Sequence, residues 1–187
     1  MDNTAALQST ARYSLGAMAL HWIIALLIAL NYTSAWVAED MPEPAKLQVM
    51  ANHKAFGLTV LALSVVRLLW RFTHRPPPLA ESLKAWEVAL ARVVHGLIYT
   101  LTIAIPLAGW ALHSAATGGK GLTWFKLFAI PGLPLAQDKA SAGIFHEMHE
   151  VFATLMLALL ALHVIAALKH QFLDRDGSMR RMVPWGK

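Results

Sequence analysis

Histidines are the clearest candidates for chemistry in this chain of 187 residues, which contains nine of them and no cysteine. His149, His163 and His170 follow one another at intervals of 14 and 7 residues, close to whole numbers of helical turns, so one helix would present them on one stripe. The stretch from Val151 to Leu168 is free of charged residues apart from His163, which places this helix in lipid or in a protein core. Imidazoles on such a helix are costly unless something binds them.

The composition is typical of a membrane protein. Hydrophobic residues make up 57% of the chain and charged residues only 14%, whereas charged residues usually form about a quarter of a soluble protein. The lack of cysteine excludes disulfides, thiolate metal sites and iron–sulfur clusters. A net charge of +5 could indicate nucleic acid, but in a chain this apolar we attribute it to the cytoplasmic flanks of membrane helices and expect no nucleic-acid partner.

Four long apolar segments predict an all-α fold, an integral membrane four-helix bundle that forms a single domain over residues 1–187. We expect its helices at about 14–37, 51–72, 89–113 and 144–172, with a kink near Pro106 in the third. An acidic loop that contains proline, residues 39–52, would separate the first two helices. The longest connection, residues 115–144, holds an aromatic cluster at 124–128 that is too short to span and is expected to lie at the membrane surface.

Lysine and arginine predict the orientation of these helices. Alternating helices place the larger group on one side, namely Arg12, Arg71, Arg75, Lys84, Arg92, Lys169, Arg175, Arg180, Arg181 and Lys187. The other side holds Lys46, Lys54, Lys120, Lys126 and Lys139, and Arg67 lies within the second helix. By the positive-inside rule, this asymmetry puts both termini in the cytoplasm.

The order of the helices pairs four histidines by depth. His21, early in the first helix, lies in the cytoplasmic half, as does His163, which is about 21 Å further along the fourth helix than His149. His53 and His149 both lie towards the outer side. Two haems that are each bound by two histidines require a pair of opposed imidazoles at each of two depths. The pairs here would be His21/His163 and His53/His149. A zinc or copper site would need its ligands at one depth.

Two further residues bear on this interpretation. Arg67 follows His53 by 14 residues on the same helical stripe, and its guanidinium needs an anionic partner, which a haem propionate would supply. His146 could replace His149 as a ligand, although its separation of 17 residues from His163 puts it off the stripe, so we favour His149. Small residues that permit close approach of backbone or porphyrin are Gly16, Ala17, Gly57, Gly96 and Gly109.

The motifs around these residues occur on each expected helix, in order. They are Leu20-His21-Trp22, Asn52-His53-Lys54-Ala55-Phe56-Gly57-Leu58, Val65-Val66-Arg67-Leu68-Leu69-Trp70-Arg71, Val94-His95-Gly96, Met148-His149-Glu150 and Leu162-His163 through Lys169-His170. Over nearly the whole chain this pattern resembles the bacterial cytochrome b561 family. The resemblance implies a multi-pass protein of the bacterial inner (cytoplasmic) membrane, with two b haems on the residues matching His21, His53, His149 and His163, and electron exchange with quinone.

Quinone exchange suggests a role for two histidines near the cytoplasmic interface. His170 shares the stripe of His163, about one haem radius away, and a neutral imidazole there could hydrogen-bond a quinone carbonyl and deliver a proton. We interpret His170, with His95 and Lys169, as the lining of a quinone site. A contact with a haem propionate, or a merely interfacial position, fits these residues equally well.

The first functional interpretation is a dihaem b-type cytochrome that carries electrons between a periplasmic-side donor or acceptor and the quinone pool, as a quinone-linked oxidoreductase. The donor could be a redox protein or superoxide, which Lys54, Lys120, Lys126 and Lys139 would attract.

Two other interpretations stay open. One is a haem-bearing membrane anchor subunit of a larger dehydrogenase complex; the other is a haem-free proton or metal transporter. The first, third and fourth helices lack carboxylates beyond their ends, which counts against transport. Membrane lipid surrounds the bundle in every case, and both a homodimer and a complex subunit are compatible with the sequence.

Overall fold

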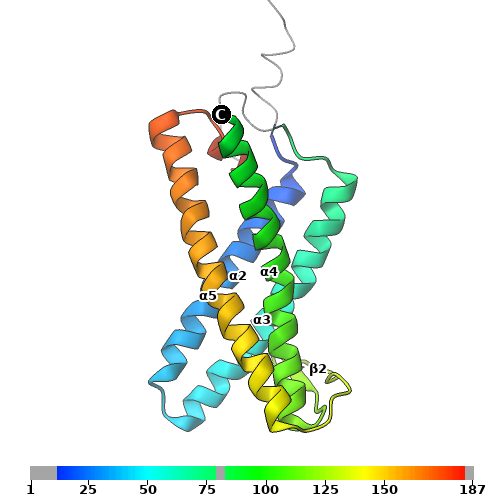
Figure 1. The fold of residues 1–187 in the computed structure, drawn as a ribbon. Helices are drawn as coiled ribbons and strands as arrows, with labels where there is room; N and C mark the ends of the chain where they lie inside the picture. Colours follow the sequence, from blue (N-terminus) through cyan, green and yellow to red (C-terminus); the bar gives the residue numbers. More distant parts are fainter. Residues whose placement is uncertain (1–11, 79–82, 184–187) are drawn as a thin grey trace, which may run out of the picture.

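The computed structural model describes residues 12–78 and 83–183, which form a bundle of long helices (Figure 1). Lys187, counted above with the cytoplasmic cations, and both ends of the expected domain lie outside the described residues. Within the described ranges, four helices are long and apolar enough to cross a membrane. They are α2 (Leu15–Glu39), α3 (Glu43–Thr73), α4 (Ala85–Thr117) and α5 (Lys139–Lys169), the last continued by the π-helical turn η1 (His170–Asp174). The all-α, four-helix class predicted from the sequence is confirmed.

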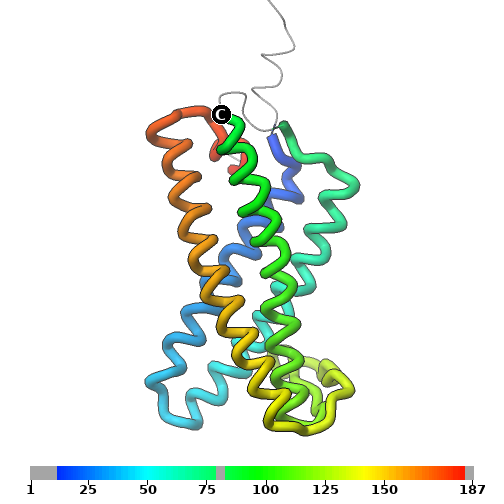
Figure 2. Tube along the Cα trace, viewed as in Figure 1, coloured from blue at the N-terminus to red at the C-terminus, as the bar shows by residue number. Residues whose placement is uncertain are grey.

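Helices that follow one another in the chain pack as pairs. α2 packs on α3 and α4 packs on α5, while α3 and α4 join the two pairs. In Figure 2 the blue start of α2 and the red end of the chain lie at one end of the bundle, which we call the terminal end. The yellow-green connection between α4 and α5 lies at the opposite end, which we call the hairpin end.

The C-terminal segment is tied back to the start of α2. It contains a short 3-10 helix, η2 (Met179–Met182). Tyr13 N donates to Arg181 O at 3.2 Å, and Trp22 Nε1 donates to Met182 O at 2.8 Å. These hydrogen bonds join the two described ends of the chain directly. One of them is made by Trp22, the residue after His21.

The helices extend further at the hairpin end than the sequence suggested. The segment 39–52, expected to be a loop, supplies the first turns of α3 and leaves only residues 40–42 between α2 and α3. Pro44 stands in the first turn of α3, where the missing N–H of proline has no helical partner to lose. α4 continues through Pro106 and ends at Thr117. The capping residue that follows, Gly118, has a φ of 68°, the left-handed value that favours glycine.

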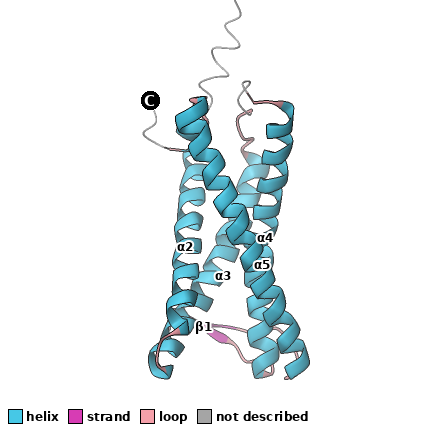
Figure 3. Ribbon diagram, turned by 60° about the vertical axis from the view of Figure 1, so that its left-hand side comes forward, coloured by secondary structure: helices cyan, strands magenta, loops and turns pink. Residues whose placement is uncertain are grey.

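A small β-hairpin, which the sequence analysis did not predict, lies between α4 and α5. β1 (Leu122–Trp124) pairs antiparallel with β2 (Phe128–Ile130), and Phe125 and Lys126 have positive φ in the turn between them. Figure 3 shows β1 at the hairpin end, among the lower ends of the helices.

The aromatic cluster of this hairpin packs against α3. Trp124 Nε1 donates to Thr59 Oγ1 at 3.0 Å, and the rings of Phe125 and Phe56 have centroids 5.0 Å apart. The aromatic residues were expected to lie along the membrane surface. In the structure they contact α3 in the two helical turns after His53.

The bundle keeps most of its apolar side chains on the outside. Its buried core is a small cluster between α4 and α5, made by Val94, Leu101, Met156 and Leu159. Large apolar side chains on the outer faces stay exposed, for example Phe72 at 76% and Ile165 at 63%. A large apolar exterior is what lipid requires of a membrane bundle, whereas soluble proteins rarely expose such contiguous surface.

Candidate haem-binding sites

Two histidines face each other in the half of the bundle nearer the hairpin end. His53 of α3 and His149 of α5 have ring centroids 6.1 Å apart. The Nδ1 atom of each ring is held by a main-chain carbonyl, at 3.2 Å from Asn31 O for His53 and 2.9 Å from Ile105 O for His149. A hydrogen bond at Nδ1 fixes the tautomer and leaves Nε2 of each ring free to bind a metal.

A cavity of about 340 Å³ adjoins this pair and is lined by residues of all four helices. Besides the two rings, its walls include Asn31, Tyr32, Gly57, Leu101, Ile105, Gly109 and Met156. Gly109 lies close to one of these rings, because a Cβ at this position would lie only 3.1 Å from the ring of His149. The glycine therefore gives the imidazole room beside α4, and the largely apolar walls suit a hydrophobic macrocycle.

The spacing of the two rings fits a single metal ion between them. Two imidazoles that bind one first-row metal from opposite sides, with bonds of about 2.0–2.1 Å, leave ring centres roughly 6 Å apart. The 6.1 Å between His53 and His149 agrees with this value. The donor set, the free Nε2 atoms and the cavity together fit a haem.

A second facing pair lies nearer the terminal end. His21 of α2 and His163 of α5 have ring centroids 6.3 Å apart. His95 of α4 also contacts the ring of His163, with ring centroids 5.3 Å apart. This separation is shorter than the roughly 6 Å that two imidazoles need when they bind one metal ion from opposite sides. The structure thus brings the four predicted histidines together as two facing pairs, with His95 beside the second pair. Their role as iron ligands stays a prediction.

His146, the alternative to His149, lies at the edge of the cavity. Its side chain is 57% exposed, and its Nδ1 is 3.5 Å from Glu150 Oε2 on the next turn. It touches the cavity, but the ring that faces His53 is that of His149. The geometry therefore favours His149 over His146 as the partner of His53, in agreement with the helical spacing of the sequence.

Arg67 lies in the same half of the bundle as the second pair. Its guanidinium carbon is 5.1 Å from the centre of the Tyr99 ring, and that of Arg71 is 5.7 Å from the same ring. None of the ion pairs formed among the described residues involves Arg67. Its charge is therefore compatible with the propionate role predicted from the sequence, which stays a prediction.

His170 begins the π-helical turn η1 at the end of α5. Its Nδ1 lies 2.9 Å from Oδ2 of both Asp174 and Asp176. The neighbouring Lys169 is paired with Glu87 Oε1 at 3.0 Å and with Asp174 Oδ2 at 2.5 Å. These carboxylates were not predicted from the sequence, in which the tail was considered only for its cytoplasmic cations. The four-residue spacing of His170 and Asp174 could have indicated their contact.

Lysines gather at the hairpin end. Lys54 Nζ is 3.3 Å from His113 Nδ1, and its side chain lines the cavity next to His53. Lys120 and Lys126 in the connection, and Lys139 at the start of α5, are exposed. Exposed carboxylates lie at the same end, namely Glu39, Asp40, Glu43, Asp138, Glu147 and Glu150. Positive charge near the first pair of histidines is therefore local to Lys54 and is not a property of the whole end.

Comparisons with known proteins identify the family of the chain. Residues 12–185 match the family model described as prokaryotic cytochrome b561. The chain is 29% identical over 183 residues to cytochrome b561 homolog 2 of Escherichia coli, covering 92% of this chain and 91% of the relative. It is 27% identical over 175 residues to the probable superoxide oxidase CybB of Yersinia pestis, covering 92% and 96% of the two chains. The chain therefore belongs to the prokaryotic cytochrome b561 family, which consists of bacterial membrane proteins and implies a b-type haem cofactor.

Proposed function

We propose that the chain is a dihaem cytochrome through which electrons cross the bacterial inner membrane, between a partner at the hairpin end and quinone at the terminal end. The observation that carries the proposal is the presence of two facing histidine pairs, with ring centroids 6.1 and 6.3 Å apart, at two levels of one bundle. A haem bound by such a pair supplies reversible one-electron chemistry. The excess of lysine and arginine near the terminal end supports a cytoplasmic position for that end.

The surrounding residues would hold and tune the cofactor. Asn31 O and Ile105 O orient the imidazoles of His53 and His149, so that Nε2 of each points away from the main chain that holds the ring. The apolar walls of the cavity would exclude water. This lowers the local dielectric and prevents water from competing with the histidines as an iron ligand. Arg67 is placed to neutralise a propionate in the other half of the bundle.

Haem stoichiometry tests this proposal. We expect the full chain, purified in detergent from cells with ample haem, to contain two b-type haems per polypeptide, low-spin in both oxidation states. The measurement is a pyridine haemochrome assay against protein mass, together with a reduced-minus-oxidised spectrum. One haem per chain would contradict one of the two pairs, and none would contradict the dihaem assignment altogether.

An anionic donor at the hairpin end is favoured by the lysines there. Lys54 borders the cavity beside His53, and three further lysines are exposed in the same region. A lysine beside the cavity would raise the encounter rate of small anions locally. The relative named a probable superoxide oxidase supports superoxide as the donor for this chain. Quinone would then be the acceptor. Quinone reduction by the isolated chain would distinguish this role from that of an anchor subunit that works only in a larger complex.

His170 is our candidate for contact with quinone. Because Nδ1 faces Asp174 and Asp176, the ring keeps Nε2 for a hydrogen bond to a quinone carbonyl. We expect His170→Gln to slow quinone reduction by about 10²-fold, the lower end of what a positioned proton-transfer group contributes. Stopped-flow oxidation of the pre-reduced protein by a soluble quinone would measure this.

The haem spectrum serves as the control for that variant. Glutamine can still donate to Asp176, so the buried carboxylate keeps a partner and both haems should be retained. His146→Gln, which changes an exposed histidine at the opposite end, should reduce quinone at the wild-type rate. Loss of a haem in His170→Gln, or an unchanged rate, would contradict the assignment of His170 to the quinone site.

A further inference from the structure

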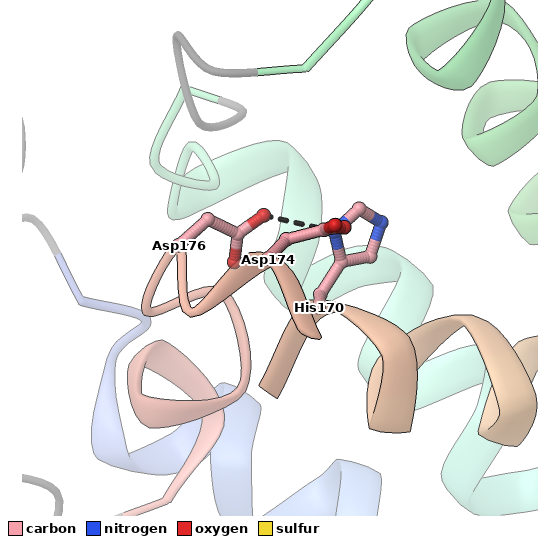
Figure 4. A group of neighbouring side chains, drawn as sticks. All are labelled: His170, Asp174 and Asp176. Carbon is pink, nitrogen blue, oxygen red and sulfur yellow. Dashed lines mark ion pairs between the residues drawn. The ribbon is translucent and has the colours of Figure 1, made fainter. Parts of the chain in front are cut away.

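The turn that ends α5 gathers three side chains of metal-binding type at the terminal end (Figure 4). We infer that His170, Asp174 and Asp176 form a binding site for a divalent transition-metal ion of the zinc class, separate from the haem iron. One ligand atom from each residue lies within 4.8 Å of the other two. The proposed electron path does not require the two carboxylates, so the cluster needs an explanation of its own.

The backbone brings the three residues together in two steps. The π-helical turn η1 places Asp174 Oδ2 2.9 Å from His170 Nδ1. Arg175 then takes a left-handed conformation, with φ 53°, and turns the chain so that Asp176 Oδ2 also comes within 2.9 Å of the same nitrogen. π-helical turns are rare and occur frequently at functional sites.

Asp176 provides an independent indication of a ligand. Its side chain is only 2% exposed, and its Oδ1 already accepts a hydrogen bond from Ser178 N at 2.8 Å. Among the described residues, its Oδ2 and His170 Nδ1 are buried atoms that make no hydrogen bond, although they lie within ion-pair distance of each other at 2.9 Å. A buried carboxylate oxygen that no hydrogen bond satisfies is costly, and a cation bound by both atoms would remove that cost.

The donor set indicates which cations suit the site. One imidazole nitrogen and two carboxylate oxygens match the ligands of zinc and related transition metals, whereas calcium and magnesium prefer oxygen alone. Three protein ligands leave a fourth tetrahedral position for water. The Asp174 side chain is 33% exposed, so an ion can enter from solvent on its side.

Lys169 forms an ion pair with one carboxylate of this site. Its ammonium lies 2.5 Å from Asp174 Oδ2, the same oxygen that faces His170. When a metal ion binds that oxygen, Lys169 can keep its other partner, Glu87 Oε1, at 3.0 Å. The ammonium and the metal therefore compete for one oxygen, and removing the ammonium should strengthen metal binding.

Zinc titration of the purified, haem-loaded chain tests the inference. A chromophoric chelator would report competition for zinc at pH 7, while the haem spectrum reports the integrity of the fold. We expect one zinc ion per wild-type chain and binding at least about tenfold weaker in Asp176→Asn, because a ligand is lost. Lys169→Met should bind zinc more tightly. Asp40→Asn, which removes an exposed carboxylate at the hairpin end, should bind as wild type does.

Three results would overturn the inference: no stoichiometric zinc in the wild type, equal affinity in Asp176→Asn, or no gain in Lys169→Met. Should Asp176→Asn lose its haem spectrum, Asp174→Asn takes its place in the comparison, with the same expected loss. The quinone role of His170 uses Nε2 and the metal site uses Nδ1. The zinc titration and the quinone assay can therefore fail independently.

Discussion

The His149→Ala chain is expected to bind one haem where the wild type binds two. His149 faces His53 at a ring separation of 6.1 Å, and its Nδ1 is held by Ile105 O, so alanine removes one axial nitrogen of the proposed pair. A b haem held by the remaining histidine alone would be high-spin and easily lost. The pyridine haemochrome assay should show half the wild-type haem content.

Two comparisons make this result specific. His146→Ala, three residues away on the same helix, should keep both haems, because its ring is exposed and paired with Glu150. The double variant His53→Ala/His149→Ala should lose no more haem than either single variant, because the two residues act on one cofactor. If His146→Ala loses the haem and His149→Ala keeps it, the assignment of the ligand is reversed.

Valine at Gly109 is expected to have nearly as large an effect without touching a ligand. A Cβ at this position would lie 3.1 Å from Cε1 and Nδ1 of His149, and the two methyl groups of valine would crowd the ring further. We expect the ring to shift by a few tenths of an ångström or more, which would weaken its bond to Ile105 O and turn Nε2 away from its position. Overpacking of this kind costs about 1–3 kcal/mol, which corresponds to an affinity for haem roughly fivefold to 150-fold weaker.

Gly143→Val is the control. Gly143 is exposed near the start of α5, outside the cavity lining, and a Cβ there has no atom within 4 Å, so valine should leave both haems in place. Haem transfer to a scavenger such as apomyoglobin would measure retention in both variants. Equal retention in the Gly109 and Gly143 variants would show that α4 does not restrain the ring of His149.

The sequence was sufficient to predict the four helices, because each carries an apolar run long enough for a membrane. It was insufficient at their ends. The acidic segment 39–52 resembles a loop, yet its residues continue α3, since proline and acidic side chains are both accepted in a first helical turn. The strands of the hairpin have three residues each, too few for an alternating pattern to be recognised.

The pairing of the histidines could also be predicted, because alternating helices and helical spacing determine the depth of each residue. The contacts that orient the rings could not. Asn31 O and Ile105 O are main-chain atoms of other helices, and their positions depend on how the helices cross. Asp176 was missed for a similar reason: only the left-handed turn at Arg175 brings it back to His170.

The cavity beside His53 and His149 has a consequence for how the protein is made. Its walls come from all four helices, and one histidine of the facing pair, His149, belongs to α5, the last of them to leave the ribosome. The pair α2–α3 can form early as a helical hairpin, but the cavity stays open until α5 has entered the membrane. Cofactor loading must therefore follow synthesis, and a chain stalled between α4 and α5 would be inserted yet unable to enclose the macrocycle.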